Sequence, residues 1–597
     1  MTLRLQETFR IDDCEVCPSR NLISGPNGAT RVEPKAMAVL MELANNAGKT
    51  VARRALIDAV WPRGFVSDDV LTRCVTQLRK ALGEDPRQSR VLETVPRKGY
   101  RLLPRVEPLG RTGQRSEIED RGQLPALLVL PFQNLSGRQD QEYLADGMTE
   151  LLIARLAAIH SLRVLSRTTA MCFKNRRVSL PELVRELNVT WIVEGSVMLA
   201  DERIQVVAQL IDARCDAHLW ADEYRRAFID LLGLQNDIST RVATEIRLKI
   251  APLSTLEAPQ QRIAAEALRS FLTARQLMSR RTPADLREAL KQLANVVELE
   301  PNYALAWGSM GEIRILLAHY GAEPPLQEVP EARACVSRAL ELDPRLAIAL
   351  GCQGILALFF DRDLEAAEAY LHRALELQPS YSLALLSMAN ICAVRGEFRE
   401  ANEWMQQTLL IDPLDIGINM NAGDHLILQR RYNEAARQLV KTLELGKSHL
   451  PSRLRLVLAL ALGGKHAEAA RHLAIVKRAV GGSAQYWEYA ALAAAAQDRS
   501  EEARRCAAEL DRLARDGFIA PWPRARACAA AGDVDRALDF LEQAAAEQSS
   551  SLIFLGVTPV FDDLRSHPGA RALLKRLRLP FESAPLLNPS RRGGVKE

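Results

Sequence analysis

The chain has 597 residues, of which 48% are hydrophobic and 25% charged, so it can bury the cores of several domains. Its net charge is only +4, but residues 1–105 hold 18 Lys and Arg against 12 Asp and Glu, an excess of +6, and the remainder is −2. The N-terminus lacks the apolar region of a signal peptide, and no segment approaches the roughly 18 apolar residues of a membrane span, so we expect a cytoplasmic protein.

Residues 4–31 alternate in short β-like pieces and predict a small antiparallel sheet ahead of the first helix. That helix is expected to start at Glu33-Pro34, because a proline at an early helical position loses no hydrogen bond. A second helix is expected to open at Arg53 and to end near Trp61-Pro62.

The next helix is predicted to begin at Ser67, whose hydroxyl can cap a first-turn N–H, with two acidic residues following it near the positive end of the helix dipole. One face is apolar and is formed by Leu71, Val75, Leu78 and Leu82. The opposite face and its flanks carry donors suited to base edges and phosphates, namely Thr72, Arg73, Thr76, Gln77, Arg79 and Lys80. A solvated amphipathic helix would show the same pattern, so this helix alone does not settle the function.

A loop follows Gly83, and VLETV then leads into a predicted β-hairpin whose turn carries Arg97 and Lys98. A basic hairpin beside a reading helix can contact the DNA backbone or the minor groove.

The segment LTRCVTQLRKALGEDP followed by LETVPRKGYRL resembles the OmpR/PhoB-type winged helix-turn-helix domain, and Val32–Pro62 resembles its first two helices. The resemblance covers about residues 4–105. It implies that the major groove is contacted by Thr72, Arg73, Thr76, Gln77, Arg79 and Lys80, and the wing contact is made by Arg97 and Lys98. Thr76 and Gln77 stand where other members often carry Arg, which leaves the preferred base sequence open. A two-component effector is disfavoured, because we find no receiver domain ahead of the winged helix.

Cys14 and Cys17 form a lone CxxC, a spacing that can serve zinc binding or redox chemistry. No second pair stands at ligand spacing, and in an extended strand the two residues point to opposite faces. We therefore expect no metal site, and we expect Cys74 to be a core thiol.

Residues 106–123 are polar and read as a linker. Residues 124–250 predict strands and helices in the order β-α-β-α-β-β-α, a small mixed α/β domain. The segments PFQNLSG, EYLADGMTELLIARL and VEGSV resemble the TolB-like domain of bacterial signalling proteins, which implies a scaffold without assignable chemistry.

From residue 264 to about residue 547 the chain repeats every 34 residues, with a large residue three positions before a recurring alanine. The alanines are Ala367, Ala401, Ala435, Ala469, Ala503 and Ala537. This period resembles the tetratricopeptide repeat and implies an α-solenoid of about eight units, whose groove holds a peptide or protein or serves self-association. Residues 548–586 are expected to cap the array, and residues 587–597 to be disordered.

The motifs GxxxxGK[ST], GxSxG and HExxH are absent, so we expect no catalytic residues, no cofactor and no enzyme. The fold class is multidomain and mainly α: a winged helix, a small α/β domain and a solenoid. Two functions stay open. The first is a regulator that binds double-stranded promoter DNA as a dimer and contacts RNA polymerase or another protein. The second is a non-catalytic scaffold whose winged helix contacts protein instead of DNA.

Overall fold

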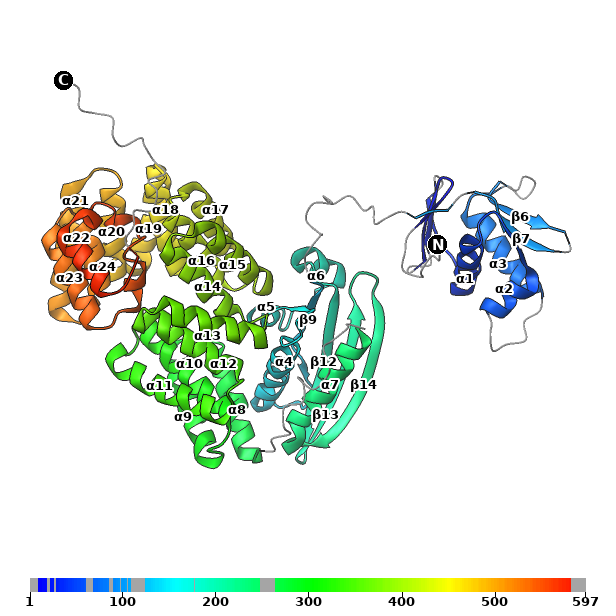
Figure 1. Cartoon of the computed structure of the whole chain (residues 1–597), viewed down its shortest axis with the longest axis horizontal. Coiled ribbons are helices and arrows are strands. Elements are labelled where there is room, and N and C mark those ends of the chain that lie inside the picture. Colours follow the sequence, from blue (N-terminus) through cyan, green and yellow to red (C-terminus); the bar gives the residue numbers. More distant parts are fainter. Residues whose placement is uncertain are drawn as a thin grey trace, which may run out of the picture. The chain divides into compact units, whose positions relative to one another are not determined.

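The computed structural model describes residues 9–18, 22–25, 28–60, 68–84, 90–96, 98–104, 106–108, 124–176, 178–246 and 263–580. The chain forms two compact units, Met1–Gln123 and Leu124–Glu597. Figure 1 shows the strands and three helices of the first unit, and the sheet and helical array of the second.

The first unit opens with a five-stranded antiparallel sheet of order β4-β3-β2-β1-β8. Its strands are β1 (Phe9–Ile11), β2 (Cys14–Cys17), β3 (Leu22–Gly25), β4 (Gly28–Arg31) and β8 (Val106–Pro108). The predicted N-terminal sheet is confirmed. The prediction that the linker starts at residue 106 was wrong, because residues 106–108 pair with β1 and close the sheet. Residues 109–123 lie outside the described residues.

Three helices and a second small sheet complete this unit. The helices are α1 (Pro34–Asn45), α2 (Arg53–Val60) and α3 (Asp68–Ala81). The sheet has the order β5-β7-β6, with strands β5 (Thr50–Ala52), β6 (Leu92–Val95) and β7 (Gly99–Leu102). The predicted helix starts at Pro34 and Arg53 are confirmed, whereas the predicted cap Ser67 lies outside the described residues.

The second unit begins with a mixed sheet of order β11-β9-β12-β13-β14, to which β10 adds by pairing with β12. Its strands are β9 (Ala126–Val129), β10 (Gln133–Asn134), β11 (Arg163–Val164), β12 (Trp191–Ala200), β13 (Arg203–Asp212) and β14 (Ala217–Ala227). Its helices are α4 (Glu142–Leu156), α5 (Arg167–Met171), α6 (Leu180–Leu187) and α7 (Leu231–Glu245), with 3-10 turns η2 (Gln139–Gln141) and η3 (Phe228–Asp230).

β14 was not predicted. Along its eleven residues only Trp220 is buried, so the period-two alternation that marks a half-buried strand is missing from its sequence. The pairing with β13 also shifts register between Leu210 and Ile211. The sheet therefore ends in a three-stranded meander in place of the expected hairpin.

Eight pairs of helices follow as an array (Figure 1). They are α8 (Ala265–Met278), α9 (Pro283–Leu299), α10 (Ala304–His319), α11 (Pro325–Leu342), α12 (Ala347–Leu356), α13 (Leu364–Leu377), α14 (Ser382–Arg395), α15 (Phe398–Ile411), α16 (Ile416–Leu428), α17 (Tyr432–Leu445), α18 (Leu450–Leu462), α19 (His466–Val480), α20 (Ala484–Ala495), α21 (Ser500–Asp516), α22 (Pro521–Ala530) and α23 (Val534–Ala546). A π-helical turn, η5 (Ala357–Asp361), ends α12.

The six alanines that recur every 34 residues are all buried, and each lies on the second helix of its pair, from α13 to α23. A Cβ added at Gly354 on α12 would stand 3.2 Å from the carbonyl of Ala367 and 2.6 Å from Leu371, so two small residues allow these backbones to approach. Paired helices at this spacing resemble a tetratricopeptide solenoid.

After α23 the chain forms three 3-10 turns and one helix: η6 (Ser550–Phe554), η7 (Pro559–Phe561), η8 (Leu564–Ser566) and α24 (Pro568–Arg576). The segment expected to cap the array therefore contains one α-helix, α24, and three short 3-10 turns. Residues 581–597, including the tail predicted to be disordered, lie outside the described residues.

This segment returns to the middle of the array. Arg430, which follows α16, donates through Nη1 to the carbonyl of Val557 (2.6 Å) and pairs through Nη2 with Asp562 (2.5 Å). Val557 packs with Cys392 and Leu428, at the ends of α14 and α16. The array is therefore closed by its own C-terminal turns.

The α/β domain and the array share one hydrophobic core, because α4 packs on α8 and their buried residues form a single cluster. Glu150 on α4 accepts a hydrogen bond from Nε of Arg275 on α8 (2.6 Å) and pairs with Arg167 on α5 (3.0 Å). The domain boundary predicted between residues 250 and 264 falls in a range that is not described.

Candidate nucleic-acid interface

Helix α3 is held by its apolar face. Leu71, Val75, Leu78 and Leu82 are all buried in the core of the first unit, as the sequence predicts. Cys74 lies beside them, and its burial, followed by the carboxylate of Glu33, raises the pKa of its thiol. Cys74 is therefore a protonated core residue.

The opposite face of α3 presents polar side chains. Thr72, Arg73, Thr76 and Lys80 are exposed on it. The Thr76 hydroxyl donates to the carbonyl of Thr72 (2.9 Å), a local bond that leaves its oxygen available as an acceptor. The structure thus brings four of the six predicted helix residues onto one accessible surface.

Gln77 and Arg79 differ from these four, because both are half-buried and hold other parts of the domain. Gln77 accepts through Oε1 from the backbone N–H of Glu33 (3.4 Å), which connects α3 to the start of α1. Its side chain is thereby directed to the protein.

Arg79 and Glu84 join the end of α3 to the wing. Arg79 donates through Nη2 to the carbonyl of Leu92 (2.9 Å) and to the hydroxyl of Thr94 (2.8 Å). Glu84 accepts through Oε1 from the N–H groups of Val91 (2.8 Å) and Leu92 (3.1 Å), and its other oxygen lies 3.7 Å from Nε of Arg79. The two side chains fix β6 relative to the helix.

Sequence reasoning assigned no role to Glu84. One feature of the sequence could have indicated its role: Glu84 directly follows Gly83, which ends the helix, and an acid there can accept from the N–H groups of a returning strand. Periodicity does not indicate which strand returns beside the end of α3.

The turn of the wing carries Lys98, which is exposed, whereas Arg97 lies outside the described residues. Gly99 starts β7 with φ +154°, and a Cβ there would stand 1.9 Å from the carbonyl oxygen of Val51. Only glycine allows β5 and β7 to pair this closely. The wing therefore depends on Gly99 as well as on the Arg79–Glu84 pair.

The cysteine pair that raised a zinc or redox role is only partly described. Cys14 is buried and its thiol lies 3.7 Å from the carbonyl of Leu82. Burial, followed by Asp12 and Asp13, raises its pKa. Throughout the described ranges, no three His, Cys, Asp or Glu side chains converge as a metal site.

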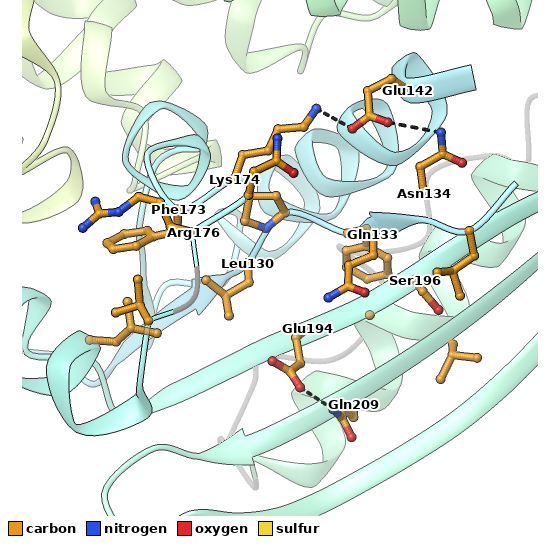
Figure 2. A pocket seen from close by; sticks show the side chains of 18 residues that line it. Leu130, Gln133, Asn134, Glu142, Phe173, Lys174, Arg176, Glu194, Ser196 and Gln209 are labelled. Atoms are coloured by element: carbon orange, nitrogen blue, oxygen red, sulfur yellow. Dashed lines mark hydrogen bonds and ion pairs between the residues drawn. The ribbon is translucent and has the colours of Figure 1, made fainter. Parts of the chain in front are cut away.

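A hollow with a volume of about 810 Å³ lies in the α/β domain. Figure 2 shows it between the loop that carries Phe173 and Arg176 and the open face of β12 and β13, where Glu194 bonds Gln209. Leu130, at the end of β9, points into it (Figure 2).

The charges at the rim of this hollow pair with one another. Lys174 contacts Glu142 (2.8 Å) and Asp146 (2.5 Å), and Asn134 donates to Glu142 (3.1 Å). Burial disfavours the charged form of Glu142, but the bonds from Lys174 and Asn134 outweigh it and lower its pKa. We assign this hollow no ligand.

Among the described helices, none has both the length and the hydropathy that crossing a bilayer requires.

Helix α3 packs with α1 and α2, presents an exposed polar face and is followed by the strands β6 and β7, an architecture typical of winged-helix domains. Residues 27–102 match the family model described as "Transcriptional regulatory protein, C terminal". The match covers the three helices and the wing.

Three further proteins are similar to parts of this chain. "Transcriptional regulator HilA" of Salmonella typhi is 26% identical over 389 residues, which are 64% of this chain and 66% of HilA. "Transcriptional activator CadC" of Escherichia coli K12 is 35% identical over 99 residues, 16% of this chain and 19% of CadC. "Putative adenylate cyclase 3" of Rhizobium meliloti is 32% identical over 192 residues, 32% of this chain and 33% of that protein. The chain thus matches a third of the cyclase's length and just under two thirds of HilA's.

Proposed function

We propose that this protein is a transcriptional regulator that binds promoter DNA through α3 and the wing. The observation that carries the proposal is the exposed surface of Thr72, Arg73, Thr76 and Lys80 beside a wing anchored by Arg79. Arg73 and Lys80 supply cationic donors for bases and phosphates, and the two threonines supply short hydroxyl contacts.

The eight predicted contact residues divide into two roles in this proposal. Thr72, Arg73, Thr76 and Lys80 contact DNA from the helix, and Arg97 and Lys98 contact it from the wing. Gln77 and Arg79 act by holding α3 and β6 in place, because their polar atoms already bond Glu33 and Leu92.

The proposal extends to the rest of the chain. The α/β domain is TolB-like and non-catalytic, and the array receives a peptide or protein signal. The protein works in the cytoplasm, on DNA as a dimer, where it contacts RNA polymerase or another protein. The C-terminal turns that pack on α14 and α16 limit where a peptide can enter the array.

A fluorescence-anisotropy titration with a promoter fragment tests DNA binding. Arg73→Ala should cost about 1–3 kcal/mol and relax the sequence preference, if Arg73 contacts a base. Lys98→Ala should weaken binding to all sequences similarly and reduce the salt slope by about one phosphate contact, near 0.9 in the logarithmic plot. Arg399→Ala, at an arginine of the array that is 87% exposed, is the matched control and should change nothing.

Two results would contradict the proposal. The first is unchanged affinity in both winged-helix variants. The second is binding that does not weaken as salt rises, which would favour a protein partner for the winged helix because phosphate contacts always release counterions.

A further inference from the structure

β14 (Ala217–Ala227) is the edge strand of the α/β sheet (Figure 1). It pairs with β13 along one side, and no described strand pairs with its other side. Residues 221–227 are exposed except Tyr224, which is half-buried. A long edge with unpaired backbone groups is a template for a further strand.

The direction of the backbone groups follows from one hydrogen bond. The N–H of Phe228 donates to the carbonyl of Glu202 (2.9 Å), so the even-numbered residues of β14 direct their backbone groups to β13. Residues 221, 223, 225 and 227 therefore direct theirs outward. In agreement, the N–H of Glu223 is bonded only locally, to the carboxylate of Asp222 (2.8 Å).

The sequence of this strand is self-complementary about Tyr224. Residues 219–229 read LWADEYRRAFI. When two copies pair in antiparallel fashion with Tyr224 on the axis, Glu223 lies opposite Arg225 and Asp222 lies opposite Arg226. The same register places Ala221 opposite Ala227.

The charges also select this register. Two β14 strands can form backbone hydrogen bonds only when the odd-numbered residues, whose N–H and C=O groups point outward, lie opposite each other. The neighbouring registers that satisfy this condition are centred one residue away, on position 223 or on position 225. One of them places Glu223 opposite Glu223, and the other places Arg225 opposite Arg225. Directly opposed like charges are destabilising, whereas opposite charges stabilise a strand pair.

The charged side chains can exchange partners at little cost. In one protomer Arg225 bonds Glu223 (2.6 Å), and their side chains are 75% and 44% exposed. Exposed pairs of this kind contribute about 0–1 kcal/mol. The corresponding pairs across two strands use the same groups and add backbone hydrogen bonds.

We propose that β14 is a homodimer interface, in which two copies of this chain pair their β14 strands in antiparallel register about Tyr224 and join their sheets. The occupant of the edge is a second copy because the palindromic order of charges fits its own reverse. This inference does not rest on DNA binding, since the contact lies within residues 124–597 alone.

The test uses two single charge reversals on the open face of the sheet. Glu223→Arg places a positive charge at both position 223 and position 225. Arg225→Glu places a negative charge at both positions. In each variant alone, two attractive pairs become repulsive, so the dimer should weaken about ten-fold or more. Mixed in equal amounts, the two variants restore both pairs and should associate as a heterodimer.

The measurement is sedimentation velocity of the full chain without DNA over a concentration series, with native mass spectrometry of the mixture. We expect a dimer for the unchanged protein, monomers for each variant, and a mixed dimer on mixing, which also shows that both variants are folded. Arg399→Glu, on the array, is the matched control and should dimerise normally. A monomeric unchanged protein, variants that dimerise as well as it does, or a mixture that stays monomeric would each overturn the interface, whatever the DNA titrations show.

Discussion

The hydroxyl of Thr169 on α5 donates to Oδ1 of Asp412, directly after α15, over 2.8 Å. Beside this bond, the N–H of Ser166 donates to the carbonyl of Ile411 (2.9 Å), and Arg163 donates through Nη1 to the carbonyl of Leu410 (2.7 Å). Three residues at the end of α15 thus hold the α/β domain, in addition to the core that it shares with α8.

Asp412 should make this junction sensitive to pH. Burial, followed by the charge of Asp415, raises the pKa of Asp412 from 3.8 to about 7. The folded state therefore binds a proton that the unfolded state releases, and the free energy of unfolding should fall as pH rises from 3.8 through about 7. Urea denaturation at a series of pH values measures this slope.

Asp412→Asn supplies the control for that slope. The amide oxygen still accepts from Thr169, but the side chain no longer titrates. We expect the pH dependence to flatten and stability above neutral pH to rise. An unchanged slope in this variant would assign the effect to other groups.

Glu84→Ala should destabilise the wing. It removes the acceptor of the Val91 and Leu92 N–H groups, and leaving such groups without a partner costs about 1–3 kcal/mol. Amide hydrogen exchange at Val91 and Leu92 should accelerate accordingly, about ten-fold or more. Glu93→Ala removes an exposed pair with Arg101 and should have a much smaller effect; equal effects would argue against the Glu84 bonds.

Gly99→Ala tests the close approach of β5 and β7. The new Cβ meets the carbonyl of Val51, so the strands must separate, at a cost of about 3 kcal/mol or more. Gly48→Ala is the matched comparison, because its φ is also positive (+79°) but nothing lies within 4 Å. It should cost about 1–2 kcal/mol by chemical denaturation. If the two substitutions lower the free energy of unfolding equally, backbone strain alone explains the cost at Gly99, without a clash with Val51.

Arg430→Gln should loosen the closure of the array. The substitution removes the pair with Asp562 and the bond to Val557, from a side chain that is only 20% exposed, and should cost about 2 kcal/mol. Limited proteolysis should then cut earlier within residues 549–566. Arg399→Gln changes an arginine that is 87% exposed and should leave the cleavage pattern unaltered. Cleavage elsewhere first would show that the closure does not depend on Arg430.

The spacing of apolar and small residues in the sequence correctly predicted which residues are buried. Leu71, Val75 and Leu78 follow a helical period and are buried, and the alanines that recur every 34 residues are buried as well. The sequence could not predict which polar side chains of α3 are exposed and which form hydrogen bonds within the domain. Arg79 donates a hydrogen bond to the carbonyl of Leu92 because β6 returns beside α3, and these two residues are 13 apart along the chain.

The remaining differences also arise from contacts distant in sequence. β14 was missed because most of its residues are exposed, so its sequence shows no alternation. The return of residues 549–562 to α14 and α16 involves partners more than 100 residues apart, such as Arg430 and Val557, which no repeat period indicates.

The core shared by α4 and α8 also restricts how this gene could be rearranged. A recombination event that fuses the winged helix to another protein would divide the chain between its two compact units, Met1–Gln123 and Leu124–Glu597. The sheet that follows cannot be transferred so simply, because a copy ending before α8 would expose the buried residues of α4 that pack on α8. We expect natural chimaeras to carry the sheet together with the first helix pairs.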